Sequence, residues 1–179
     1  YFTDAERNQI KKSWDFLVQK ASGQLRPCGK PYYLHPLRGA AILAANKMDC
    51  ASIIAAILHS INDFNVQPEQ IESLFGKDIS KIIMTTNKIL NMPLNARTLQ
   101  QSDAIRSMFF AMSDDARIIL ITLADRLDRM RNIRNFSKEE QHVVAEAAVD
   151  IWAPLADRLG MQSEKNEFED LSLKCTCAG

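Results

Sequence analysis

Apolar residues recur at intervals of three and four along almost the whole chain, which is the spacing of an amphipathic α-helix. Thr3 and Glu6 have the spacing of a capping box, and Pro36 suits the first position of a helix. Gly76 can end a short helix, and Pro93 breaks the pattern between two later ones. We therefore predict helices over residues 4–21, 36–47, 50–63, 68–75, 77–90, 98–112, 115–134, 138–158 and 162–174.

This pattern predicts an all-α fold, with a single multi-helix domain over residues 1–179. The chain contains 6 Gly and 6 Pro, and it has no Asn-Gly or Asp-Gly pair, the strongest hairpin signal. No shift in composition marks a second domain. The longest aliphatic run, Ile53–Leu58, is far too short to cross a membrane.

The charge of the chain is balanced, with 22 Lys and Arg against 22 Asp and Glu, which disfavours a wholly basic nucleic-acid binder. We expect no direct nucleic-acid site and no membrane partner. Cys175 and Cys177 lie too close together and too near the end to form a zinc site, and the 4 cysteines make no disulfide framework. A reducing cytoplasm is therefore the expected location. The chain opens at Tyr1 rather than Met, so we expect a fragment of a longer protein.

Two histidines occupy unusual places in the pattern. His35 precedes Pro36 at a helix start, and His59 follows the apolar run. A helix through Asp63 would place His59 and Asp63 one turn apart, where they can meet each other or a common ion. The alternative is a core histidine that is hydrogen-bonded to a neighbouring group. The face that these residues would share consists of Ser52, Ala55, Ala56, His59, Asn62 and Asp63.

The predicted helix over residues 115–134 has an apolar stripe with a polar face beside it. Asp125 points away from this stripe, and Arg129 and Asn132 follow on the same face. Asp125 can pair with Arg129 at the surface, or it can be aimed into a pocket that Arg129 and Asn132 line. The stripe consists of Leu120, Leu123, Leu127 and Met130. The arginines of this segment form either a solvated face or a polyphosphate site: Arg126, Arg129, Arg131 and Arg134.

Four ordered motifs resemble the N-terminal hydrolase domain of the long Rel/Spo alarmone synthetase/hydrolases, which belongs to the His-Asp metal-dependent phosphohydrolase superfamily. They are Gly29-Lys30-Pro31-Tyr32-Tyr33-Leu34-His35-Pro36, Ala55-Ala56-Ile57-Leu58-His59, Leu123-Ala124-Asp125-Arg126-Leu127 and Trp152-Ala153-Pro154-Leu155-Ala156-Asp157-Arg158-Leu159-Gly160. The resemblance implies a helical domain that removes the 3′-pyrophosphate of guanosine tetra- or pentaphosphate with manganese. It also implies that a synthetase domain, absent here, follows in a full-length GTP pyrophosphokinase, through which the ribosome becomes a further partner.

The resemblance implies that His35, His59 and Asp125 hold the metal. Family members have an aspartate where this chain has Ser60, and a neutral hydroxyl cannot supply the charge of a carboxylate. The acidic Glu-Asp pair of the family reads Asp63-Phe64 here, so Asp63 is the remaining catalytic candidate. General acid–base catalysis, which contributes roughly 10²–10⁴ in rate, is then impaired.

The resemblance also implies an altered nucleotide pocket. Arg26, which stacks on the base in the family, is kept, whereas the basic residue after it is replaced by Pro27. The pocket positions four and seven residues after Asp125 are Arg129 and Asn132.

The departures from the family fall on the site while the scaffold motifs remain, which favours a catalytically inactive, regulatory domain. Two alternatives stay open. An active manganese-dependent 3′-pyrophosphohydrolase can use Asp63 as the missing ligand, with Arg129 neutralising the pyrophosphate. A sensor domain can bind the alarmone without hydrolysing it, through Arg26 and the arginine run of residues 126–134.

Overall fold

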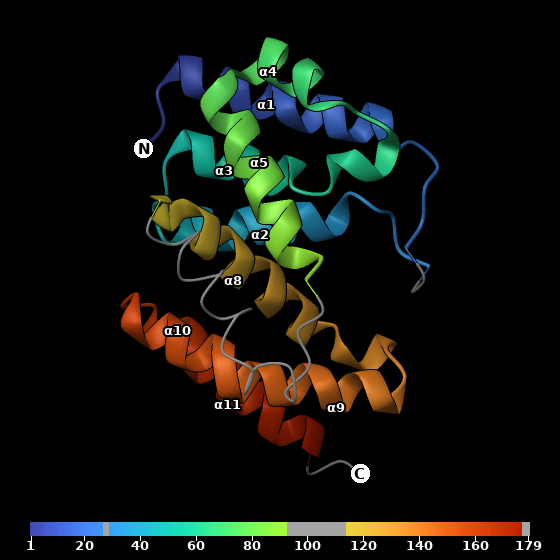
Figure 1. The fold of residues 1–179 in the computed structure, drawn as a ribbon, viewed down its shortest axis with the longest axis vertical. Coiled ribbons are helices and arrows are strands. Elements are labelled where there is room, and N and C mark those ends of the chain that lie inside the picture. Colours follow the sequence, from blue (N-terminus) through green and yellow to red (C-terminus); the bar gives the residue numbers. More distant parts are fainter. Residues whose placement is uncertain (27–28, 93–113, 177–179) are drawn as a thin grey trace. The chain divides into compact units, whose positions relative to one another are not determined.

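The computed structural model describes residues 1–26, 29–92 and 114–176, and its described residues are helices joined by turns (Figure 1). They contain no β-strand, only an isolated bridge between Leu25 and Pro31. The all-α prediction is thereby confirmed, while the predicted helix over residues 98–112 and the cysteine at position 177 lie outside the described residues. The α-helices are α1 (Asp4–Lys20), α2 (Leu34–Ala45), α3 (Cys50–Leu58), α4 (Pro68–Phe75), α5 (Lys77–Leu90), α8 (Ala116–Arg131), α9 (Lys138–Ala147), α10 (Ala153–Arg158) and α11 (Gln162–Thr176).

The described residues fall into two compact units. The first contains α1 to α5 and the part of α8 that ends at Ala124, and the second contains the rest of α8 with α9, α10 and α11. Helix α8 is continuous through Ala124 and Asp125, so the residues on either side of this boundary belong to one helix.

Helix α3 is the centre of the first unit and packs against α1, α2 and α5 (Figure 1). Its residues from Ser52 to Leu58 are all buried, as expected for a helix that is apolar on every side. Asp49 caps the helix by accepting a hydrogen bond from the backbone N–H of Ser52. The capping box predicted at the start of α1 is also present, because Thr3 and Glu6 bond each other's backbone N–H groups.

The prediction of one helix over residues 50–63 is wrong at its end, since α3 stops at Leu58 and a 3₁₀ turn follows at Ile61–Phe64. Two side chains take over the helical hydrogen bonds at this point. The His59 ring bonds the Ala56 carbonyl, and Asn87 of α5 donates to the His59 carbonyl. The backbone N–H of Asp63 donates to the Ser60 carbonyl, three residues back, instead of the carbonyl four residues back that a regular α-helix would use. The helix thus ends where two local bonds and one tertiary bond, from Asn87, replace the regular helical pattern.

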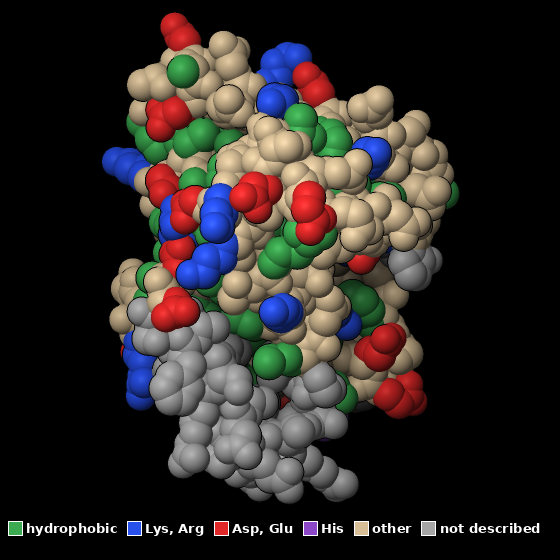
Figure 2. All heavy atoms as spheres, turned by 45° about the horizontal axis from the view of Figure 1, so that its top comes forward, with side chains coloured by type: hydrophobic (Ala, Val, Ile, Leu, Met, Phe, Trp, Pro, Cys, Tyr) green, Lys and Arg blue, Asp and Glu red, His purple; other side chains and the backbone are tan. Residues whose placement is uncertain are grey.

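The second unit contains one long helical segment alongside which α11 packs. This segment was predicted as a single helix over residues 138–158, and it runs through α9, a π-helical turn at Ala148–Trp152 and α10. Pro154 explains the π turn, because its ring lacks an N–H and would meet the carbonyl of Asp150 in a regular helix. Figure 2 shows one face of the molecule, on which acidic and basic side chains are interspersed, in keeping with the balanced composition.

Candidate metal centre

Two buried histidines of the first unit lie side by side. His35 belongs to the first turn of α2 and is 5% exposed, and His59 directly follows α3 and is 4% exposed. Their ring centroids are 5.5 Å apart, with the rings inclined at 70°. Helix α2 begins two residues earlier than predicted, so His35 lies inside the helix rather than before it. The packing of α2 on α3 therefore brings together two imidazoles that are 24 residues apart in sequence.

The backbone of α3 orients the His59 ring. Its Nδ1 lies 2.7 Å from the Ala56 carbonyl oxygen, and because a carbonyl can only accept, Nδ1 carries the proton. The lone pair is then on Nε2, at the other side of the ring. A histidine that binds a metal commonly donates its second ring N–H to a carbonyl in this way, which fixes both tautomer and orientation.

Asp125 of α8 completes a group with the two histidines. One carboxylate oxygen of Asp125 and one ring nitrogen of each histidine all lie within 4.8 Å of one another, and all three residues are buried. Among the described residues, this is the group of His, Cys, Asp and Glu side chains that can hold a metal ion. Two imidazoles and a carboxylate form a mixed nitrogen and oxygen donor set, which suits a first-row divalent ion. The residues present therefore fit a metal, and the predicted ligands are brought together.

The position next to His59 offers no carboxylate, because Ser60 stands there and is half-buried. Asp63, the proposed substitute, lies in the 3₁₀ turn and is exposed. It is not a member of the group formed by His35, His59 and Asp125. The expectation that Asp63 shares a helical face with His59 is wrong, because α3 ends before both residues.

Asp63 is bonded instead to Tyr32, a residue that sequence reasoning missed although it lies within the first motif. The Tyr32 hydroxyl donates a hydrogen bond to the Asp63 carboxylate. Burial and this carboxylate raise the pKa of Tyr32 to about 12, while Ser60 and Arg26 act on the phenol in the opposite direction. The Phe64 ring meets the Tyr32 ring edge-on, with centroids 4.7 Å apart. Four positions singled out from the sequence thus surround one tyrosine.

Arg26 lies against the same tyrosine. Its guanidinium carbon is 5.3 Å from the centroid of the Tyr32 ring, a cation–π contact. Two backbone bonds shape the loop that carries both residues: the Arg26 N–H donates to the Lys30 carbonyl and the Tyr32 N–H to the Gln24 carbonyl.

Arg129 and Asn132, the predicted nucleotide contacts, both lie in the second unit. The Arg129 guanidinium lies 4.8 Å from the centroid of the Phe136 ring. The Asn132 amide donates to the backbone carbonyl of Asp128 at 2.8 Å. These two side chains therefore make contacts within their own unit, and their role towards a nucleotide stays a prediction.

The arginine run around them does not form one solvated face. The Arg126 guanidinium lies 5.5 Å from the centroid of the Trp152 ring and 3.9 Å from Asp125, and burial lowers the pKa of Arg126. Arg131, by contrast, is exposed and forms a bidentate pair with Glu167 at 2.6 and 2.7 Å.

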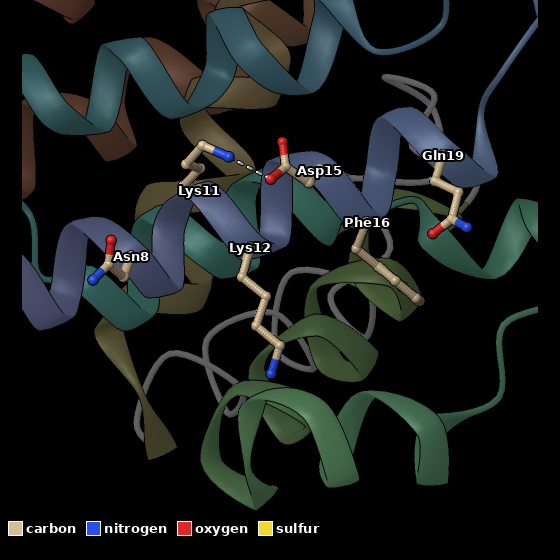
Figure 3. A pocket seen from close by; sticks show the side chains of 6 residues that line it. All are labelled: Asn8, Lys11, Lys12, Asp15, Phe16 and Gln19. Carbon is tan, nitrogen blue, oxygen red and sulfur yellow. Dashed lines mark hydrogen bonds and ion pairs between the residues drawn. The ribbon is translucent and has the colours of Figure 1, made fainter.

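A separate surface hollow lies along α1, as Figure 3 shows, and it contains none of the predicted site residues. Its charged side chains already have partners: Lys11 pairs with Asp15 at 2.8 Å, and Lys12 donates to the carbonyl of Leu74 at 2.9 Å. The hollow is lined by Asn8, Lys11, Lys12, Asp15, Phe16 and Gln19. Separately, within the described residues, no helix combines the length and apolar character that crossing a membrane requires.

Comparison with known proteins gives a consistent result. Residues 13–162 match the family described as "HD domain". The chain is 38% identical over 178 residues to "GTP pyrophosphokinase" of Myxococcus xanthus, covering 97% of this chain and 24% of that protein. It is 36% identical over 175 residues to "Guanosine-3′,5′-bis(diphosphate) 3′-pyrophosphohydrolase" of Borreliella burgdorferi, covering 97% of this chain and 26% of that protein. The chain thus spans about a quarter of the length of these relatives.

A solved structure shares the fold. It is described as "A metazoan ortholog of SpoT hydrolyzes ppGpp and plays a role in starvation responses". The TM-score is 0.62 at 21% identity, and the match covers 98% of this chain and 95% of that one. At this identity the likeness concerns the fold alone.

Proposed function

This chain belongs to the HD domain family and matches the N-terminal hydrolase domain of Rel/Spo proteins, and we propose that it is the inactive, regulatory hydrolase-like domain of a longer guanosine tetra- and pentaphosphate synthetase/hydrolase. The observation that carries this proposal is the group of His35, His59 and Asp125 with an uncharged Ser60 beside it. In the full-length protein the domain acts in the cytoplasm on an attached synthetase domain, and the ribosome is reached through the rest of that protein.

The proposed metal is manganese, held by His35, His59 and Asp125. When bound, such an ion polarises a phosphate oxygen and lowers the pKa of water. Three ligands supply only one negative charge, that of Asp125, because both imidazoles bind in the neutral form. With Ser60 in place of a second carboxylate, the site holds a divalent ion weakly.

Proton transfer is the second deficit. Phe64 offers no titratable group and packs its edge against Tyr32. Asp63 keeps a carboxylate, but that carboxylate accepts the Tyr32 hydroxyl bond. A positioned acid or base contributes roughly 10²–10⁴ to a rate. The absence of an acid at Phe64 alone would therefore lower turnover by a factor of this order.

The test measures metal content, hydrolysis and nucleotide binding on the chain of residues 1–179. The protein is purified with manganese supplied, its metal is counted, and pyrophosphate release from guanosine tetraphosphate is assayed, with binding followed by calorimetry. We expect little metal and no release. The double variant Ser60→Asp/Phe64→Asp returns both carboxylates and should gain metal and measurable release, whereas adding His35→Ala to it should abolish both.

Turnover by the unmodified chain would contradict the proposal and favour the active alternative, in which case Asp63→Ala should abolish release. Tight binding of guanosine tetraphosphate without release would instead identify a sensor, and Arg26→Ala should then weaken binding. The His35→Ala variant separates these outcomes from contamination by a cellular hydrolase, because a contaminant's activity would survive this substitution.

A further inference from the structure

Tyr32 connects the positions at which this chain departs from the family's acidic pair. Its hydroxyl donates to the carboxylate of Asp63, and its ring meets the edge of Phe64 at 4.7 Å. Ser60 acts on the same phenol, since it lowers the pKa that burial and Asp63 raise. All of these residues belong to the first unit, so their arrangement is internal to it.

Among the described residues the Asp63 carboxylate takes part in no ion pair, and it accepts the bond from the Tyr32 hydroxyl, on which Ser60 also acts. A hydrogen bond to a charged acceptor favours the bonded state over the open state by roughly tenfold or more. Asp63 has to leave this hydrogen-bonded position before its carboxylate can reach a metal held by His35 and His59, because it lies outside their group.

We propose that Tyr32 is a positioning residue that holds the Asp63 carboxylate outside the group formed by His35, His59 and Asp125. This explains why Asp63 does not replace the carboxylate missing at Ser60, although it follows His59 by only four residues. Arg26 contacts the same tyrosine, with its guanidinium carbon 5.3 Å from the centroid of the Tyr32 ring. The inference rests on the proposed function, since it concerns the same metal site.

The first experiment needs no metal. The tyrosines are replaced by 3-fluorotyrosine, and their ¹⁹F resonances are followed with pH in the whole chain. The Tyr32 resonance is assigned from Tyr32→Phe. We expect Asp63→Asn to move the Tyr32 titration to lower pH by about 1 unit, because the charged acceptor that opposes ionisation is gone. An unchanged titration would show that the two side chains do not interact in solution, and this would overturn the proposal.

The second experiment measures manganese binding by electron paramagnetic resonance. We expect Tyr32→Phe to tighten binding by about tenfold, since the freed Asp63 no longer gives up a hydrogen bond. Combining Tyr32→Phe with Asp63→Asn should remove the gain. Tyr33→Phe is the matched control, because Tyr33 packs on Trp14 and should leave affinity unchanged.

An affinity that is unchanged or weakened in Tyr32→Phe would overturn the proposal, and so would a gain that survives Asp63→Asn. The phenylalanine keeps the ring contact with Phe64, and Asp63 is exposed, so both variants retain the fold. The failure of this inference can be told apart from the failure of the proposed function. Hydrolysis by the unmodified chain would contradict that function while leaving the fluorine result standing, and a failed fluorine result leaves the hydrolysis assay unaffected.

Discussion

Arg117 joins the N-terminal ends of three helices of the first unit, and Arg117→Ala should destabilise that unit. Its Nε and Nη2 donate to the carboxylate of Asp115 at 2.7–3.0 Å, just before α8. Its Nη1 and Nη2 donate to Asp78 in the first turn of α5 at 3.0 and 3.1 Å. Asp49, the cap of α3, lies 3.6 Å from Nη1. One guanidinium thus compensates three carboxylates, which would repel one another without it.

The magnitude follows from how exposed each pair is. Asp115 is 18% exposed and Arg117 26%, so their bidentate contact is largely shielded and contributes about 1–2 kcal/mol. Asp78 and Asp49 are 64% and 55% exposed, and such pairs contribute about 0.5 kcal/mol or less each. We expect Arg117→Ala to lower the free energy of unfolding by about 2 kcal/mol at neutral pH and low salt.

The effect depends on pH in a definite direction. Hydrogen bonds from Arg117 lower the pKa of Asp115 in the folded protein. A carboxyl with a lowered folded pKa stabilises the fold fully above its unfolded pKa of about 3.9, and this stabilisation is lost as the pH falls through the folded pKa. The difference between Arg117→Ala and the unmodified chain should therefore be largest near pH 7 and shrink towards about pH 3.

Urea unfolding followed by circular dichroism at both pH values tests this reasoning. Arg117→Lys keeps the charge but not the planar fork, so it should recover less than half of the loss. Arg7→Ala is the control, because the Arg7–Asp4 pair is 64% and 94% exposed and should contribute nothing measurable. A loss within about 0.5 kcal/mol of zero for Arg117→Ala, or an equal loss at both pH values, would refute the argument.

Two further changes probe the second unit. Phe168→Ala should lower the free energy of unfolding by about 3–5 kcal/mol, because the Phe168 side chain is fully buried and its removal leaves a cavity. The control is Leu173→Ala on the same helix, which should change the free energy of unfolding little because Leu173 is 62% exposed. Ser137→Ala should lower the free energy of unfolding by about 1 kcal/mol, because Ser137 and Glu140 form the capping box of α9. Thermal unfolding measures this loss. Ser137→Asp can still cap the helix and should retain most of the stability.

Local signals predicted much of the fold. The helices over residues 68–75 and 77–90 have the predicted bounds, because Pro68 and Gly76 mark them chemically. Gly76 separates them with φ 93°, a left-handed conformation that favours glycine. The end of α3 was not predicted, because it involves a bond from Asn87 to the His59 carbonyl. Hydrophobic periodicity cannot reveal a contact between residues so far apart in sequence.

The same division holds for the candidate site. The spacing of His59 within an apolar run and the place of Asp125 beside an apolar stripe could be read along the sequence, and the structure brings both together with His35. Tyr32 could not be found in this way. It lies in a loop without periodicity, and its importance comes from a contact with Asp63, 31 residues later.

His59 and Asp125, two of the proposed metal ligands, have structural partners of their own. His59 is fixed by the Ala56 carbonyl and by Asn87, and Asp125 lies 3.9 Å from Arg126, whose burial requires a nearby negative charge. Replacing the His59 side chain would leave the Ala56 carbonyl without its ring donor, and replacing Asp125 would leave Arg126 without its carboxylate, whether or not a metal is bound. Ser60 is half-buried, whereas Asp63 is exposed and its carboxylate accepts the bond from the Tyr32 hydroxyl. A serine at position 60 is therefore compatible with the helical scaffold, as the proposed inactive domain requires.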